Sequence, residues 1–315
     1  MKLYDENSMT QIIIALVGIL VFVAIFSLTG CFDNVMLPPS TQPVQVERAS
    51  QYDVALQLPD ADLSDLVAVA GNAIYVPNAE GTQIYKFRMD GSLVGSISVP
   101  FRKPFNGVRV RNQVLRIASD AGRLYMQTRA YTTEFRFNEW FYEVVDVNTK
   151  QVVSTLRWGD TEPFGEKPQL ADYMIADGSL WTIDSDVYNV SENVGTNRIV
   201  ALDPLTLHPT SLAVELDFDL YDAFKATNKP YQNTAWYCLN SQDSQMVSTG
   251  DILWMTCTGN GTGNNFTAFS MMTGNKLPNL DFVTDVRTTD ASLSNNRIYA
   301  LSVDYNVLCW QIITK

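Results

Sequence analysis

A short pattern recurs five times after residue 50 and constrains the fold more than any other feature of the sequence. Each copy is a turn rich in Gly, Asp or Asn, then an aliphatic residue, then Tyr or Trp, then a small or apolar residue. The five copies are Gly71–Val76, Ala121–Met126, Asp177–Thr182, Gly250–Met255 and Asn295–Ala300. Their aliphatic positions are spaced 50, 56, 73 and 45 residues apart. Repetition at such a period predicts one supersecondary unit per copy.

A second pattern follows each of the first four copies and reads as a β-hairpin. It is an alternating strand that ends in an Asp-, Asn-, Gly- or Pro-containing turn, followed by another strand. The copies are Ile84–Gly91, Val144–Lys150, Ile199–Thr206 and Ala268–Gly274. Further strands are expected at Leu93–Val99, Val152–Trp158 and Ser211–Leu216. No convincing amphipathic helix follows residue 50, so each unit is an antiparallel meander of about four strands.

A repeated four-stranded unit of this length is typical of a β-propeller blade. The sequence predicts an all-β fold of about five blades over residues 51–315. The fifth copy lacks an outer strand, and we expect Asp53–Pro59 to complete it and close the ring. Residues 217–242 are either an insertion, which we favour, or a degenerate sixth blade.

The hairpin turns resemble those of the PQQ-like propeller repeats, whose core reads hydrophobic-x-Asp-x-x-Thr-Gly. Partial matches are Val145-Asp146 with Thr149, Leu202-Asp203 with Thr206, and Phe269-Ser270 with Thr273-Gly274. The resemblance implies the propeller fold and no cofactor.

The N-terminus carries a signal or a membrane anchor. Residues Ile12–Phe26 are apolar or small, and the stretch from Ile12 to Cys31 would span about 30 Å as a helix, one hydrocarbon core. Leu28–Cys31 resembles a bacterial lipobox, which implies cleavage before Cys31 and its lipidation. Two early acids, Asp5 and Glu6, favour an uncleaved helix instead. Either alternative makes the rest of the chain extracytoplasmic, on the periplasmic face of the inner or outer membrane, and the Pro-rich residues 32–50 read as a tether.

Composition excludes several classes of function. The net charge of −12 opposes binding to a phosphate backbone, so no nucleic-acid partner is expected. The single histidine, His208, argues against a His-based metal site or a Ser-His-Asp triad. No nucleotide-binding fingerprint is present, and we assign no catalytic or metal-binding residue.

Two candidate sites remain outside the N-terminus. Cys238 and Cys257 are the favoured disulfide pair; the alternative is unpaired buried thiols. An aromatic stretch on a long hairpin of the second repeat forms a candidate partner-binding face; the alternative is packing between blades. Its residues are Phe135, Phe137, Trp140 and Phe141.

These features predict a non-catalytic scaffold or protein-binding subunit of a cell-envelope or membrane complex. The combination of lipobox and propeller is similar to that of the BamB-like outer-membrane assembly lipoproteins. The alternative is an envelope glycoside hydrolase or lactonase that uses carboxylates around the central channel. The candidate carboxylates, most of which we expect to serve turns, are Asp120, Asp177, Asp184, Asp186 and Asp251.

Overall fold

The computed structural model describes the region after residue 43 in nine stretches. They are residues 44–59, 62–99, 110–120, 122–132, 138–157, 173–183, 198–217, 245–256 and 265–314. Within them no helix is long and apolar enough to cross a membrane. The apolar run at residues 12–26 lies outside these stretches, as does most of the expected insertion at 217–242.

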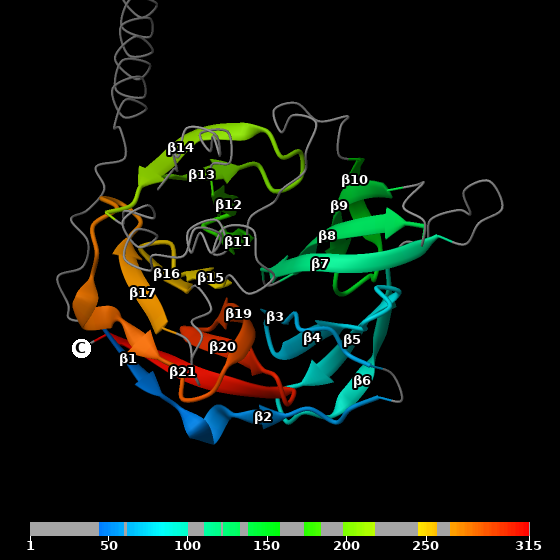
Figure 1. The fold of residues 1–315 in the computed structure, drawn as a ribbon, viewed down its shortest axis with the longest axis horizontal. Coiled ribbons are helices and arrows are strands. Elements are labelled where there is room, and N and C mark those ends of the chain that lie inside the picture. The colour runs from blue at the N-terminus through cyan, green and yellow to red at the C-terminus, as the bar shows by residue number, and fades with distance from the viewer. Residues whose placement is uncertain are drawn as a thin grey trace, which may run out of the picture. The chain divides into compact units, whose positions relative to one another are not determined.

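The described chain forms five antiparallel sheets, each of which begins with its innermost strand (Figure 1). Blade 1 consists of β3 (Ala68–Ala70), β4 (Ala73–Pro77), β5 (Gln83–Arg88) and β6 (Leu93–Ser98). Blade 2 consists of β7 (Arg111–Ser119), β8 (Arg123–Tyr131), β9 (Asn138–Asp146) and β10 (Val152–Arg157). Blade 3 consists of β11 (Tyr173–Ala176), β12 (Ser179–Ile183), β13 (Arg198–Leu202) and β14 (Pro209–Glu215).

Blades 4 and 5 complete the set. Blade 4 consists of β15 (Gln245–Ser248), β16 (Ile252–Thr256), β17 (Asn265–Ser270) and β18 (Phe282–Val283), with the short 3-10 helix η3 (Pro278–Leu280) before its last strand. Blade 5 consists of β19 (Thr288–Ser294), β20 (Arg297–Ser302), β21 (Asn306–Thr314), and β1 (Val44–Arg48) with β2 (Val54–Ala55) from the other end of the chain.

The innermost strands form a closed ring. In order around it, β3 contacts β7, β7 contacts β11, β11 contacts β15, β15 contacts β19, and β19 returns to β3 (Figure 1). Because β11 contacts β15 directly, the ring has five blades, and this confirms the predicted β-propeller. The ring therefore has no place for a sixth blade between blades 3 and 4, which was the alternative for residues 217–242.

The repeated sequence pattern is explained by how each blade packs on its two neighbours. Its aliphatic residue and the aromatic residue after it lie on the second strand of the blade, and side chains alternate along a strand. The aliphatic residue packs against the preceding blade: Ile74, Leu124, Leu180, Leu253 and Ile298, all 0% exposed. The aromatic residue packs against the following blade: Tyr75, Tyr125, Trp181, Trp254 and Tyr299. One hydrophobic cluster thus fills each of the five blade interfaces.

The hairpin motif also has a physical explanation. The carboxylate of Asp203 accepts hydrogen bonds from the backbone N–H groups of Leu205 and Thr206, at 3.0 and 2.8 Å, and from the Thr206 hydroxyl at 2.8 Å. These bonds, chiefly that of the Thr206 hydroxyl, lower the pKa of Asp203. Asp146 and Thr149 repeat the arrangement in blade 2. Side-chain capping of a turn therefore selects Asp and Thr at this spacing.

The ring is closed by the N-terminal part of the described chain. Strand β1 pairs with β21 from Val44–Thr314 to Arg48–Trp310, and β2 pairs with Val307 and Asn306 of the same strand. Closure by the segment Asp53–Pro59 is thus found only at Val54 and Ala55. The main closing strand is Val44–Arg48, which lies within the tether predicted for residues 32–50. Its alternating pattern, Val-Gln-Val-Glu, is that of a strand.

Candidate functional site

Three of the four strands of blade 2 are longer than every described strand of the other blades except β21. Its strands β7, β8 and β9 are nine residues long, whereas β4, β12 and β16 have five residues each. The pairing of β8 with β9 continues to Tyr131 and Asn138, and Figure 1 shows β7 and β8 running outward from the ring. The long hairpin predicted for the second repeat is therefore present.

The four predicted partner-binding aromatics have different positions. Phe135 and Phe137 lie outside the described residues. Phe141 is 8% exposed and packs with Val110 and Ala130 inside blade 2. Phe141 is thus not a surface anchor, because its strand position turns it toward these two neighbours. Trp140, on the opposite face of β9, is half-buried beside the cluster between blades 2 and 3.

An arginine that no sequence motif had singled out completes this surface. The Arg129 guanidinium carbon lies 4.9 Å from the ring centre of Tyr131 and 5.2 Å from that of Trp140. Arg129 and Trp140 are cross-strand neighbours, and Tyr131 lies two residues further on the same face. All three side chains are half-buried, and we refer to them as the blade-2 aromatic surface. The sequence signal that could have shown this surface is the spacing of Tyr125, Arg129 and Tyr131, since residues an even number apart share one face of a strand.

The candidate catalytic carboxylates that the structure describes lie in turns. The Asp120 carboxylate accepts hydrogen bonds from the N–H groups of Gly122 and Arg123, both at 2.9 Å, and from the Tyr125 hydroxyl at 2.5 Å. Burial, followed by this last bond, raises the pKa of Tyr125. Asp177 and Asp251 are exposed in turns of blades 3 and 4, while Asp184 and Asp186 lie outside the described residues. Asp177 and Asp251 thus lie in the turns where the sequence predicts them, and Asp120 serves a turn as well.

Polar side chains of the innermost strands bind the backbone of neighbouring strands. The Asp290 carboxylate accepts the N–H of Val67 at 2.8 Å, and the Ser292 hydroxyl accepts the N–H of Val69 at 2.9 Å. The Ser119 hydroxyl donates to the carbonyl of Val69 at 2.8 Å. An innermost strand has one unpaired edge, so these contacts satisfy backbone groups at the centre of the ring. The polar residues in the segment Thr288–Ser292 are the sequence signal that could have predicted these side-chain contacts with the backbone.

Among the described residues, the cysteines form neither a redox site nor a metal site. Cys31, Cys238 and Cys257 lie outside the described residues. Cys309 is a free thiol, 0% exposed, and burial raises its pKa to about 11. Such a thiol is unreactive near neutral pH. In the part of the chain that the structure describes, no three His, Cys, Asp or Glu side chains are placed to hold a metal ion.

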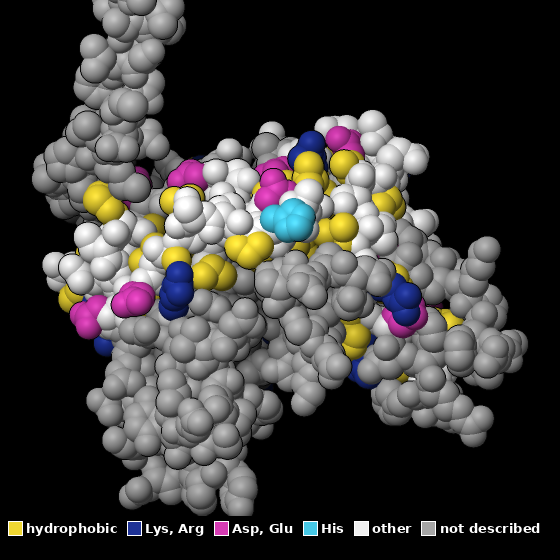
Figure 2. Space-filling view, turned by 90° about the horizontal axis from the view of Figure 1, so that it is seen from above, with side chains coloured by type: hydrophobic (Ala, Val, Ile, Leu, Met, Phe, Trp, Pro, Cys, Tyr) yellow, Lys and Arg dark blue, Asp and Glu magenta, His cyan; other side chains and the backbone are white. Residues whose placement is uncertain are grey.

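The histidine is a surface residue. His208 is exposed in the turn between β13 and β14. Figure 2 shows the histidine side chain on one face of the molecule, where the described hydrophobic side chains are scattered among polar ones.

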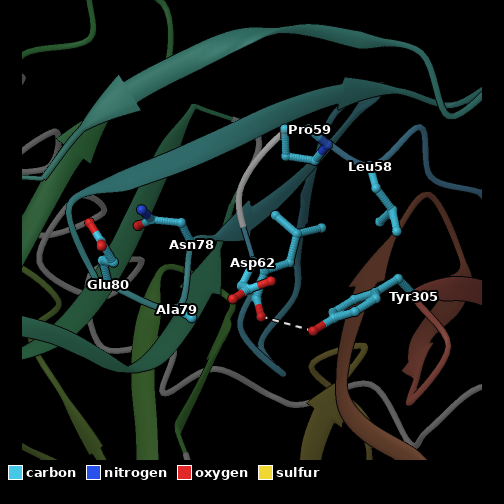
Figure 3. A pocket seen from close by; sticks show the side chains of 8 residues that line it. Leu58, Pro59, Asp62, Asn78, Ala79, Glu80 and Tyr305 are labelled. Atoms are coloured by element: carbon cyan, nitrogen blue, oxygen red, sulfur yellow. Dashed lines mark hydrogen bonds between the residues drawn. The ribbon is translucent and has the colours of Figure 1, made fainter.

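A cavity of about 530 Å³ lies where the closing segment meets blades 1 and 5. Its walls come from the segment between β2 and β3, from the β4–β5 loop, and from Tyr305 in the β20–β21 turn (Figure 3). The two carboxylates on these walls are Asp62 and Glu80. No sequence motif pointed to this cavity, because its residues are brought together by ring closure.

The sheet topology defines the molecule as a five-bladed β-propeller with an extended second blade. No protein-family model matches the sequence, and no curated protein matches it. Solved structures of similar fold include the glutaminyl cyclase of Myxococcus xanthus, 9% identical, with a TM-score of 0.48 over 87% of this chain and 99% of that chain. They also include BamB of Moraxella catarrhalis, 12% identical, with a TM-score of 0.30 over 78% and 71%. A GH43 endo-arabinanase of Bacillus licheniformis is 13% identical, with a TM-score of 0.39 over 82% and 96%. At these values the likenesses carry no argument about activity.

Proposed function

We propose that this protein is a non-catalytic, extracytoplasmic scaffold that binds other proteins of a cell-envelope or membrane complex. It is held at the membrane by its N-terminal segment and needs no cofactor. The observation that carries the proposal is the extension of blade 2, which presents Arg129, Tyr131 and Trp140 on one face. Arginine, tyrosine and tryptophan are the residue types that dominate the energetics of protein interfaces.

The geometry of the extension supports binding. The Arg129 guanidinium is stacked beside two rings, which fixes its orientation before a partner arrives. A preorganised side chain loses less conformational entropy on binding than a mobile one. Near the outer end of the extension, Arg157 pairs with Glu139, which joins β10 to β9 one residue from Trp140. A rigid blade thus supports the aromatic surface.

The alternative is a carboxylate-dependent envelope enzyme, and two described carboxylates at the centre of the ring do not support it. Asp120 uses both oxygens in its turn, and Asp290 uses both on backbone N–H groups. A general acid or a nucleophile needs an oxygen that can reach a substrate.

The aromatic surface is tested by replacing Arg129, Tyr131 and Trp140 together with alanine in the full chain. We expect the variant to lose at least about 30-fold in affinity for its envelope partners, equivalent to about 2 kcal/mol. The measurement is quantitative co-purification from membranes, with mass spectrometry of proteins that accompany the wild type at near-stoichiometric amounts.

A control variant carries alanine at Val94, Val153 and Leu212, which are exposed on the outer strands β6, β10 and β14. It should co-purify the same proteins as the wild type. If the blade-2 variant co-purifies the same proteins in the same amounts, the blade-2 aromatic surface is not the binding site. A wild-type protein that carries no stoichiometric partner would contradict the scaffold itself.

The anchor is tested by the intact mass of the membrane-extracted protein, beside a Cys31→Ala variant. We expect a chain that begins at Cys31 with added acyl mass, and loss of that mass and of processing in the variant. A chain that begins near Met1 without acyl mass would contradict lipidation and favour a retained helix. A chain that begins near residue 31 without acyl mass would contradict anchoring altogether.

A further inference from the structure

The cavity between the closing segment and blades 1 and 5 has the features of a built site. Leu63, which is buried, is part of its lining. Leu58 and Pro59 add apolar groups, and Tyr305 supplies an aromatic wall (Figure 3). Its volume of about 530 Å³ lies within the range of small-molecule sites. The shape and apolar walls suit an organic molecule better than a bare ion.

Hydrogen bonds hold these walls in place without a ligand. The side chain of Asn78 accepts the N–H groups of Thr82 and Gln83, both at 2.9 Å, and so fixes the β4–β5 loop. The N–H of Ala79 donates to the carbonyl of Asp62 at 2.9 Å, which ties that loop to the closing segment.

The aromatic wall is fixed in the same way. The Tyr305 hydroxyl donates to the carbonyl of Leu63 at 2.9 Å, which ties the turn of blade 5 to the closing segment. Tyr305 also has a φ of +57°, a conformation that costs energy for a bulky residue, so its ring is placed by the surrounding fold.

The charge of the cavity is negative. Its described lining contains the carboxylates of Asp62 and Glu80 and no lysine or arginine. Both carboxylates are exposed, and among the described residues neither side chain forms a hydrogen bond or an ion pair. Burial, then the charges of Asp65 and Asp62, raise the pKa of Tyr305. A cation that enters the cavity therefore meets negative charge and an aromatic face together.

We propose that this cavity binds a small organic cation, an alkylammonium or guanidinium compound. Its cationic group lies beside Asp62 or Glu80, and its apolar body contacts Leu58 and the Tyr305 ring. A metal ion fits less well, since the lining offers two carboxylates beside apolar walls and no described third ligand of the His, Cys, Asp or Glu type. The net charge of −12 attracts cations to the protein as a whole.

Binding at this place also bears on ring closure. Two of the wall segments meet within blade 1, and the third, with Tyr305, comes from blade 5, so the walls are complete only when blades 1 and 5 lie side by side in the closed ring. A ligand that binds the closed form and not the open form stabilises closure by mass action. The inference is independent of the proposed scaffold role, because it concerns a different part of the molecule from blade 2.

The test uses the full chain in detergent and isothermal titration with 1,4-diaminobutane and agmatine, with 1,4-butanediol as the uncharged analogue. We expect saturable binding of one or both cations, a rise in Tm with cation concentration, and no response to butanediol. Asp62→Asn and Glu80→Gln should each weaken binding about tenfold or more. The matched control, Asp251→Asn, removes the same charge at an exposed turn of blade 4 and should bind as the wild type does.

Several outcomes would overturn the proposal. One is the absence of saturable cation binding up to about 10 mM, a range that covers weak ligands. Another is an unchanged affinity in the Asp62→Asn, Glu80→Gln double variant. A third is a loss of affinity in Asp251→Asn equal to that in the cavity variants. Competition by Ca²⁺ as effective as that by a second amine would mean binding to charge alone. Both lining carboxylates are exposed, so the variants are expected to fold, and circular dichroism establishes this before titration.

Discussion

Replacing Trp254 with alanine is expected to lower the free energy of unfolding by about 3–5 kcal/mol. Trp254 is 0% exposed and packs at the interface of blades 4 and 5 beside Phe266, Phe282 and Trp310. Its indole N–H donates to the carbonyl of Leu280 at 3.0 Å. Alanine would leave a cavity between the blades and an unpaired carbonyl. The measurement is urea unfolding of the full chain, followed by circular dichroism.

A Trp254→Phe variant separates the two contributions. It keeps a six-membered aromatic ring but loses the indole N–H and part of the ring volume, so we expect a smaller loss, about 1–2 kcal/mol. If the alanine variant were no less stable than the phenylalanine variant, packing at this interface would not hold blades 4 and 5 together.

Trp254 also shows why so much of the fold could be predicted from the sequence. An aliphatic residue and an aromatic residue in succession point to opposite faces of a strand. A strand with both faces buried must lie between two other layers, and five such strands at similar spacing require a ring. The side chains of Leu253 and Trp254 confirm this, since they pack against blades 3 and 5 respectively.

The features that the sequence did not predict depend on contacts between residues that are distant in the sequence. Val44–Arg48 is a good strand by its pattern, but its partner, β21, lies more than 250 residues away at the other end of the chain. Phe141 and Trp140 are adjacent and both aromatic, yet the closeness of Val110 and Ala130 decides that only Phe141 is buried. The cavity joins Asp62, Glu80 and Tyr305, whose proximity is set by ring closure. Local patterns carry no information about such neighbours.

Gly274, the glycine of the hairpin motif, is also explained by a contact with a distant residue, and its replacement should strongly lower stability. Three residues occupy the equivalent position after the capped turn: Lys150, Leu207 and Gly274, with φ of 59°, 59° and 73°. Since lysine and leucine adopt this conformation, positive φ alone does not require glycine here. The requirement comes from packing, because a Cβ at Gly274 would lie 1.7 Å from the carbonyl oxygen of Glu215 in blade 3.

We therefore expect Gly274→Ala to destabilise the protein by about 2–4 kcal/mol, from backbone strain together with the forced separation of blades 3 and 4. The matched control is Gly178→Ala. Gly178 has the same φ of 73°, but no atom lies within 4 Å of the position that an alanine Cβ would take there, so only the backbone strain of about 1–2 kcal/mol remains. Urea unfolding of the two variants gives the difference directly. Equal losses would mean that the carbonyl of Glu215 moves away from the new Cβ at little cost. A greater loss at Gly274 would show that the close approach of Glu215 in blade 3 requires glycine at this position of blade 4.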